Sequence, residues 1–282
     1  MSCLPQHRSP DPRLAPFVEV YHEVRTPNDA TVEHVVVPRG GSGMVFTLAG
    51  HYQGALGERP FEDIPPAIAH GQFTCWATNR FSKGHHGFLV MFTAIGWHGL
   101  TGQPALALTD GFEDLVLANS GDADAMQALV DGIEGASSFD ERCDVADGIL
   151  GGLLERRGNH SRALELAAAG ADRIREAAGV IGVGDLAKEI ATTERTLRRA
   201  FDRAVGISPK TFASIQRVNR VIVDLHRNPP CDWQDLVDAY GYADQSHFGR
   251  EFRRLTGLSP SAYLPENHPL EKSFAAIASG AA

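Results

Sequence analysis

Cysteine is scarce in this sequence and is never closely paired. The 282 residues contain four cysteines, Cys3, Cys75, Cys143 and Cys231, with no CxxC or other short spacing between them. Zinc fingers and dithiol redox motifs need closely spaced thiols, and disulfide scaffolds are dense in cysteine. We therefore expect reduced thiols, and neither a metal-finger domain nor a disulfide framework.

Membrane, export and catalytic signals are missing as well. No apolar run reaches the roughly 18 residues that a membrane span requires. The first residues, MSCLPQHRSPDPRL, lack the basic-then-apolar order of an export signal. No GxSxG, GxGxxG or GxxxxGK[ST] motif occurs, so no nucleophile elbow or nucleotide-binding loop supports catalysis. We expect a cytoplasmic protein without a membrane partner that is not an enzyme and has no catalytic residue and no cofactor.

Several histidines occur in the first half, but their spacing does not predict a metal site. The HEXXH motif is absent, and so is the HxH-then-Glu spacing of cupin metal centres. His85 and His86 are adjacent, which on a strand would point them to opposite faces. We expect surface or singly hydrogen-bonded histidines rather than metal ligands.

Positive charge is concentrated in one part of an acidic chain. The whole sequence has 26 Lys and Arg against 35 Asp and Glu, a formal charge of −9. Residues 1–170 hold 11 basic and 21 acidic side chains, whereas residues 171–265 hold 14 and 12. A polyanion would be repelled by the first part and tolerated by the second.

The first half has the pattern of an α+β domain. Between residues 31 and 92, short β-branched and aromatic runs are separated by Gly, Pro and Asn, which predicts a small β-sheet or barrel. After Gly111, apolar residues recur every three or four positions, which predicts helices. We place this domain at residues 1–157, followed by a linker or helix start at 158–171. Four aromatic side chains are candidates for lining a ligand pocket, with the hydrophobic core as their alternative location: Trp76, Phe81, Phe92 and Trp97.

Residues 183–206 have the spacing of a helix-turn-helix. The apolar residues fall on one face of each helix: Leu186, Ala187 and Ile190 in the first, Leu197 and Phe201 in the second. Ala187 is the small residue that close crossing of the helices requires. Thr193 is placed to cap the second helix with its hydroxyl.

The same arrangement returns in residues 233–257. Gly241 allows the turn, Asp244 is the expected helix cap, and Phe248 and Phe252 face inward. Leu197 and Phe248 are 51 positions apart, and both units end in a Gly-x-Ser-Pro stop. A duplicated unit is far more specific than one helix-turn-helix match. The result is an all-α C-terminal domain with two helix-turn-helix units.

A long helix is expected between the two units. Apolar residues of the segment from Ser208 to about Arg227 form one stripe, and Asn228-Pro229-Pro230 ends it. About 18 residues at 1.5 Å each span roughly 27 Å. This approaches the ~34 Å of one DNA turn, so two second helices could enter successive major grooves.

The run LVxxYGYxDQSHFxREFRRxxGxSPxxY resembles the signature of the AraC/XylS family of bacterial transcription regulators. Residues 172–265 are similar to the whole DNA-binding domain of that family, and residues 266–282 read as a loosely held tail. Two positions depart from the family pattern: Val237 stands where Ala is usual, and Ala191 where Gly is common. The first half resembles, more faintly, the sensing or association domain of one AraC-type subgroup.

The resemblance implies double-stranded DNA as a partner and assigns roles to residues. Arg and Gln can read guanine and adenine edges in the major groove, and the base-facing candidates are Arg195, Arg198, Arg199, Gln245, Ser246 and Arg250. The phosphate candidates are Lys210, Arg217, Arg253 and Arg254. For Arg199 and Arg250, a phosphate contact or an intramolecular carboxylate is an equal alternative.

The sequence is also compatible with other functions. An enzyme in the first half would need a bound metal or cofactor, and a DNA-repair methyl acceptor would need clustered cysteines that the sequence lacks. A purely dimerising first half is a milder alternative to a sensor. A small-molecule effector, a homodimer and RNA polymerase are further partners that the family suggests.

Overall fold

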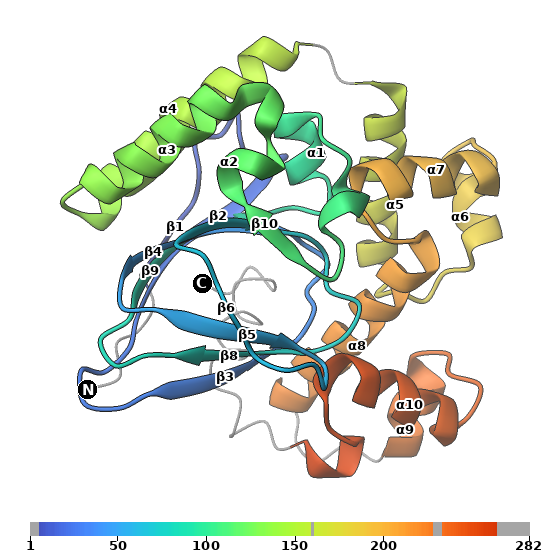
Figure 1. Cartoon of the computed structure of the whole chain (residues 1–282). Helices are drawn as coiled ribbons and strands as arrows, with labels where there is room; N and C mark the ends of the chain where they lie inside the picture. Colours follow the sequence, from blue (N-terminus) through green and yellow to red (C-terminus); the bar gives the residue numbers. More distant parts are fainter. Residues whose placement is uncertain (1–5, 159–160, 228–232, 264–282) are drawn as a thin grey trace.

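The N-terminal half folds around two antiparallel sheets. The computed structural model describes residues 6–158, 161–227 and 233–263. In these ranges, sheet A has the strand order β1 (Gln6–Arg8), β2 (Val18–Arg25), β9 (His86–Phe92), β4 (Gly43–Ala49), β7 (Ala67–His70) and β10 (Phe112–Asp114). Sheet B has the order β3 (Val32–Val36), β8 (Ala77–Phe81), β5 (Tyr52–Leu56) and β6 (Glu62–Asp63). The predicted β region is confirmed, and it takes the form of two sheets that face each other (Figure 1).

Helices cover the outer face of sheet A. Phe88, Val90 and Phe92 alternate along β9 and are fully buried, as a half-buried strand requires. Phe88 contacts Phe139 of α4, and the Tyr21 hydroxyl of β2 donates to Asp147 on the same helix, 2.7 Å away. Figure 1 shows α3 and α4 side by side above this sheet. The helices of this half are α1 (Gly96–Thr101), α2 (Leu115–Ala118), α3 (Ala123–Gly135) and α4 (Phe139–Arg157), with 3-10 turns η1 (Ala105–Leu108) and η2 (Ser120–Asp122).

The C-terminal half is helical throughout its described residues. Its elements are α5 (Arg162–Glu176), α6 (Val183–Glu189), α7 (Glu194–Ala204), α8 (Pro209–Arg227), α9 (Trp233–Ala239), α10 (Gln245–Thr256) and the 3-10 turn η3 (Pro260–Ala262). The long helix α8 connects the α6–α7 pair to the α9–α10 pair (Figure 1). The fold is therefore an α+β domain followed by an all-α region with two helix-turn-helix units. The tail predicted at 266–282 lies outside the described residues.

The two halves share one continuous hydrophobic core and are joined by hydrogen bonds. The N-terminal half touches the end of the first unit, the long helix α8 and the end of the second unit. The bonds are Thr109 Oγ1 to Gly206 O at 2.7 Å, Gln216 Nε2 to Arg39 O at 3.0 Å, Asn219 Nδ2 to Pro38 O at 3.1 Å and Trp76 N to Arg254 O at 3.3 Å. Both helix-turn-helix units are thus attached to the same body.

Candidate nucleic-acid interface

The first unit is formed by α6 and α7. Leu186 and Ala187 of α6 and Leu197 and Phe201 of α7 are almost completely buried where the helices cross. Ala191 turns the chain between the helices with φ at +52°. The Thr193 hydroxyl accepts a hydrogen bond from the backbone N–H of Thr196 at 3.2 Å and so caps α7.

The second unit repeats this arrangement with α9 and α10. Leu236 and Val237 of α9 are buried, as are Phe248 and Phe252 of α10, so the larger Val237 is accommodated inside the fold. The Asp244 carboxylate caps α10 by accepting from the backbone N–H of His247 at 2.6 Å. The apolar faces of α7 and α10 are buried by packing against the rest of the chain, so their polar faces point outward.

The turns of the two units differ in length by one residue. Ala191 N donates to Lys188 O in the first turn, and Gly241 N donates to Asp238 O in the second. These residues are 50 positions apart, whereas the caps Thr193 and Asp244 are 51 apart. The spacing between the units is therefore 51 positions for the second helices and 50 positions for the turns that precede them.

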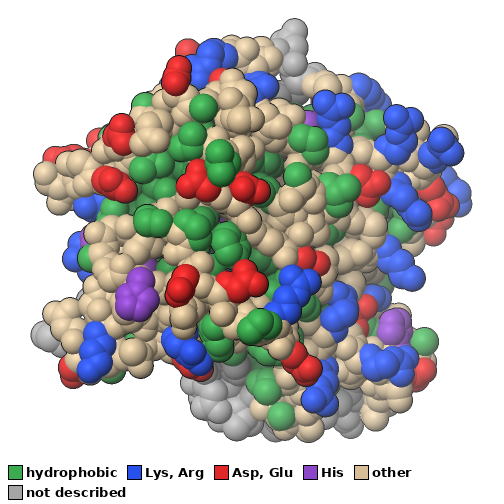
Figure 2. Space-filling model, in the orientation of Figure 1, with side chains coloured by type: hydrophobic (Ala, Val, Ile, Leu, Met, Phe, Trp, Pro, Cys, Tyr) green, Lys and Arg blue, Asp and Glu red, His purple; other side chains and the backbone are tan. Residues whose placement is uncertain are grey.

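All six base-facing candidates lie on the exposed sides of α7 and α10, namely Arg195, Arg198, Arg199, Gln245, Ser246 and Arg250. None of the four arginines forms an ion pair with another described residue. Figure 2 shows Lys and Arg side chains gathered on the right-hand side of this view, where Figure 1 places α6, α7 and α10. Acidic side chains are frequent on the left, over α3 and α4. The exposed arginines of α7 and α10 therefore give this side of the molecule a concentration of positive charge.

The four phosphate candidates divide into two groups. Lys210 and Arg253 are exposed. The Arg254 guanidinium instead donates to the backbone carbonyl of Thr74 and to the Ser214 hydroxyl at 2.9 Å. Arg217 is only partly exposed and is held by the Glu251 carboxylate at 3.1 Å. Two of the four side chains are thus already engaged within the chain.

The four aromatic pocket candidates are not brought together by the fold. Phe92 and Trp97 are buried in the core, with 0% and 2% of their surface exposed. Phe81 packs against Tyr52 within sheet B, with the ring centroids 5.3 Å apart and the rings tilted by 30°. Trp76 lies against Gly257 at the end of α10. Core packing explains Phe92 and Trp97, and an interdomain contact explains Trp76.

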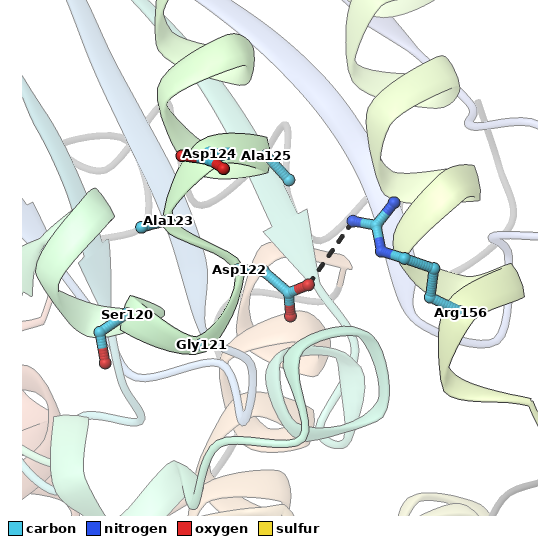
Figure 3. A pocket seen from close by; sticks show the side chains of 7 residues that line it. All are labelled: Ser120, Gly121, Asp122, Ala123, Asp124, Ala125 and Arg156. Carbon is cyan, nitrogen blue, oxygen red and sulfur yellow. Dashed lines mark ion pairs between the residues drawn. The ribbon is translucent and has the colours of Figure 1, made fainter.

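Two cavities of the N-terminal half are lined by other residues. One, of about 580 Å³, lies between the start of α3 and the end of α4, where Arg156 and Asp122 form an ion pair at 3.6 Å (Figure 3). The other, of about 420 Å³, is lined by Thr47, Leu48, His86, Glu134 and Arg142. Arg142 and His86 each approach the buried Glu23 carboxylate to 3.2 Å. Sequence reasoning gave no signal for this cluster, because Glu23 and Arg142 are 119 positions apart.

Two histidines of the first half, His22 and His85, are more deeply buried than the sequence suggested. His22 and His85 have 3% and 2% of their surface exposed, and burial lowers the pKa of each to about 4. The prediction of surface or singly hydrogen-bonded rings is wrong for His85, which packs between Phe81 and Tyr52. Among the described residues, no group of three or more His, Cys, Asp or Glu side chains is arranged to hold a metal ion.

Comparison with known proteins agrees with this geometry. Residues 186–265 match a family described as a helix-turn-helix domain. The C-terminal region of this chain is an AraC-type helix-turn-helix domain. Residues 6–114 match a family described as a domain of unknown function, DUF6597. This second match spans every described strand of the two sheets, from β1 to β10, and names no ligand. No helix in the described ranges is long and apolar enough to cross a membrane.

A named relative matches the chain over a limited length. The chain is 30% identical over 93 residues to YidL of Escherichia coli (strain K12), an uncharacterized HTH-type transcriptional regulator. The alignment covers 32% of this chain and 31% of YidL, so the chain spans about a third of the length of that curated relative.

Two solved structures resemble the chain along most of its length. ToxT from Vibrio cholerae O395 has a TM-score of 0.42 and 12% identity, covering 92% of this chain and 98% of ToxT. The AraC-like transcriptional activator CuxR has a TM-score of 0.26 and 12% identity, covering 99% of this chain and 90% of CuxR.

Proposed function

We propose that this chain is a transcription regulator that binds a specific double-stranded DNA sequence with its two recognition helices, α7 and α10. The observation that carries the proposal is the repeated unit: each recognition helix is capped, buried on its apolar face and exposed on its polar face. One major groove is contacted by α7, whose Arg195, Arg198 and Arg199 bind base edges or phosphates there. The adjacent major groove is contacted by α10 through Gln245, Ser246 and Arg250. Because Gly249 has no side chain, α10 has fewer side chains that can contact bases.

The long helix α8 supports binding to successive grooves. Its 19 residues at 1.5 Å each give a length of about 28 Å. Adjacent major grooves on one side of the duplex are about 34 Å apart. A single chain with one unit near each end of α8 therefore contacts two neighbouring grooves. Lys210 and Arg253, both exposed, are the phosphate contacts that this arrangement favours.

The N-terminal domain, residues 1–157, is proposed to control residues 172–265 by binding a small effector or by self-association. Its hydrogen bonds to Gly206, to α8 and to Arg254 support this role. Through these bonds, a conformational change in the N-terminal domain would be transmitted to both helix-turn-helix units. RNA polymerase is the partner through which such a regulator acts on transcription. No observation on this chain favours an enzyme over a regulator.

The test is selection of a binding sequence from a random pool of duplex DNA, followed by fluorescence anisotropy titration. The wild-type chain should enrich one bipartite sequence whose two halves are about one helical turn apart. Its affinity should fall steeply between low and moderate salt, because phosphate neutralisation releases counterions. Failure to enrich any sequence, or binding that salt does not affect, would contradict the proposed function. Melting shifts across metabolite pools would separate a sensor from a purely dimerising domain.

A further inference from the structure

Arg217 on α8 and Glu251 on α10 form a two-pronged ion pair between the long helix and the second recognition helix. Arg217 Nη2 lies 3.1 Å and 3.4 Å from the two Glu251 oxygens, and Arg217 Nε lies 3.3 Å from Oε1. The Tyr242 hydroxyl donates to the same carboxylate at 2.9 Å, and the guanidinium carbon lies 4.4 Å from the centroid of the Tyr242 ring. Every partner of Arg217 in this cluster belongs to the second unit.

The cluster is sheltered from solvent. The exposed fractions of the Arg217 and Glu251 side chains are 17% and 12%. A planar guanidinium that donates to one carboxylate through both Nε and Nη2, and lies over an aromatic ring, has a fixed orientation that Lys cannot reproduce. The contact therefore restrains how α10 is rotated and tilted on α8.

The first unit has no counterpart of this cluster. With the caps Thr193 and Asp244 aligned, Glu251 corresponds to the buried Ala200 of α7. In the turns, Thr192 N donates to Ala187 O as Tyr242 N donates to Val237 O, so Tyr242 corresponds to Thr192. The first unit therefore folds without an ion pair of this kind. Of the two units, only the second has the cluster.

We propose that Arg217 and Glu251 are positioning residues that set the orientation of the second recognition helix, and that Arg217 is not a phosphate contact. This inference rests on the proposed function. Arg250 is adjacent to Glu251, so the bond that holds Glu251 also fixes where Arg250 points. Pairing with Arg217 also neutralises a carboxylate that would otherwise repel the DNA backbone from α10.

Three variants distinguish positioning from phosphate contact: Arg217→Gln, Arg217→Lys and Glu251→Gln. The probe is the duplex that the wild-type chain selects from a random pool, together with versions randomised in one half-site at a time. Arg173→Lys is the matched control, because Arg173 pairs with Glu189 in the first unit but both side chains are more than a third exposed. Thermal unfolding of every variant is measured in parallel.

A positioning role makes all three variants behave alike. Each should bind the selected duplex about tenfold more weakly, the loss that breaking a sheltered charged hydrogen bond causes. The loss should disappear on the probe whose second half-site is randomised, and the slope of affinity against salt should stay that of the wild type. Arg173→Lys should change affinity less than twofold.

The opposite pattern would overturn the proposal. If Arg217 contacts a phosphate, Arg217→Lys should bind like the wild type, and Glu251→Gln should bind more tightly with a steeper salt slope. If the variants lose affinity equally for both half-sites and have a lowered melting temperature, the ion pair has only a general structural role. That result would also overturn the proposal. A wild-type chain that selects no duplex would instead refute the proposed function on which the inference rests.

Discussion

The indole of Trp76, in the N-terminal domain, lies against Gly257, the residue that ends the second recognition helix. A Cβ atom placed on Gly257 would lie 3.0 Å from the Trp76 ring carbons Cδ2 and Cε2. Gly257 also has φ at +76°, a left-handed conformation that side chains disfavour. Trp76 N donates to Arg254 O in the preceding turn. Both the helix end and the interdomain contact therefore require glycine at this position.

The substitution Gly257→Ala should lower the free energy of unfolding by about 1–3 kcal/mol, because the added methyl group meets both backbone strain and the indole. Denaturant unfolding followed by circular dichroism measures this change. Gly249→Ala in the interior of α10 is the matched control, because its Cβ would meet nothing within 4 Å. That control should raise stability by about 0.5–1 kcal/mol. Equal effects of the two substitutions would refute the account of Gly257.

At Ala191, in the turn of the first unit, a substitution to glycine should raise stability. Ala191 is exposed and has φ at +52°, where the second unit has Gly241 at +63°. Ala191→Gly should raise the free energy of unfolding by about 0.5–1 kcal/mol, because relief of left-handed strain exceeds the added chain entropy. Ala169→Gly in the exposed interior of α5 should instead lower it by about 1 kcal/mol. A loss of stability in both variants would show that Ala191 is unstrained.

Arg198 tests the recognition face of α7. Arg198→Ala should weaken binding to the selected duplex by about 1–3 kcal/mol if the side chain reads a base, with little change in melting temperature because the residue is exposed. Arg162→Ala on α5, whose side chain is 71% exposed, is the control and should leave binding nearly unchanged. Anisotropy titration measures both. If Arg198→Ala binds the duplex with unchanged affinity, Arg198 does not contact a base.

Local patterns were sufficient to predict the helical half. The cap Thr193, the turn glycine Gly241 and the buried Leu197 and Phe248 are each set by neighbours within one or two helical turns, and the structure has them in these roles. The helix-turn-helix units were therefore visible in the sequence. The alignment of Ala191 with Gly241, which shows that the second turn is one residue longer, comes from their matching backbone hydrogen bonds.

Contacts between distant segments were beyond prediction. The contact between Arg217 and Glu251 could not be predicted, because the two residues are 34 positions apart and lie on different helices. The contact between Trp76 and Gly257 could not be predicted either, because nothing near Trp76 in the sequence indicates that Gly257 packs on its ring. An exposed arginine and a paired one have the same local pattern, and only the tertiary arrangement separates them.

Buried histidines should make the stability of the N-terminal domain depend on pH. Burial lowers the pKa of His85 to about 4, below the ordinary value of 6.5. A ring whose pKa is depressed in the folded state contributes stability that is fully present above pH 6.5 and is lost as the pH falls toward 4. For His85 the loss between pH 7 and pH 5 should be on the order of 2 kcal/mol. His22, with a pKa also near 4, acts in the same direction.

Urea unfolding at pH 7, 6 and 5 measures this dependence. His85→Phe keeps an aromatic ring against Phe81 and Tyr52 but cannot take up a proton, so its stability should fall less between pH 7 and pH 5 than that of the wild type. Parallel slopes for the wild type and His85→Phe would mean that His85 accepts a proton in the folded chain, and would contradict its burial as the cause.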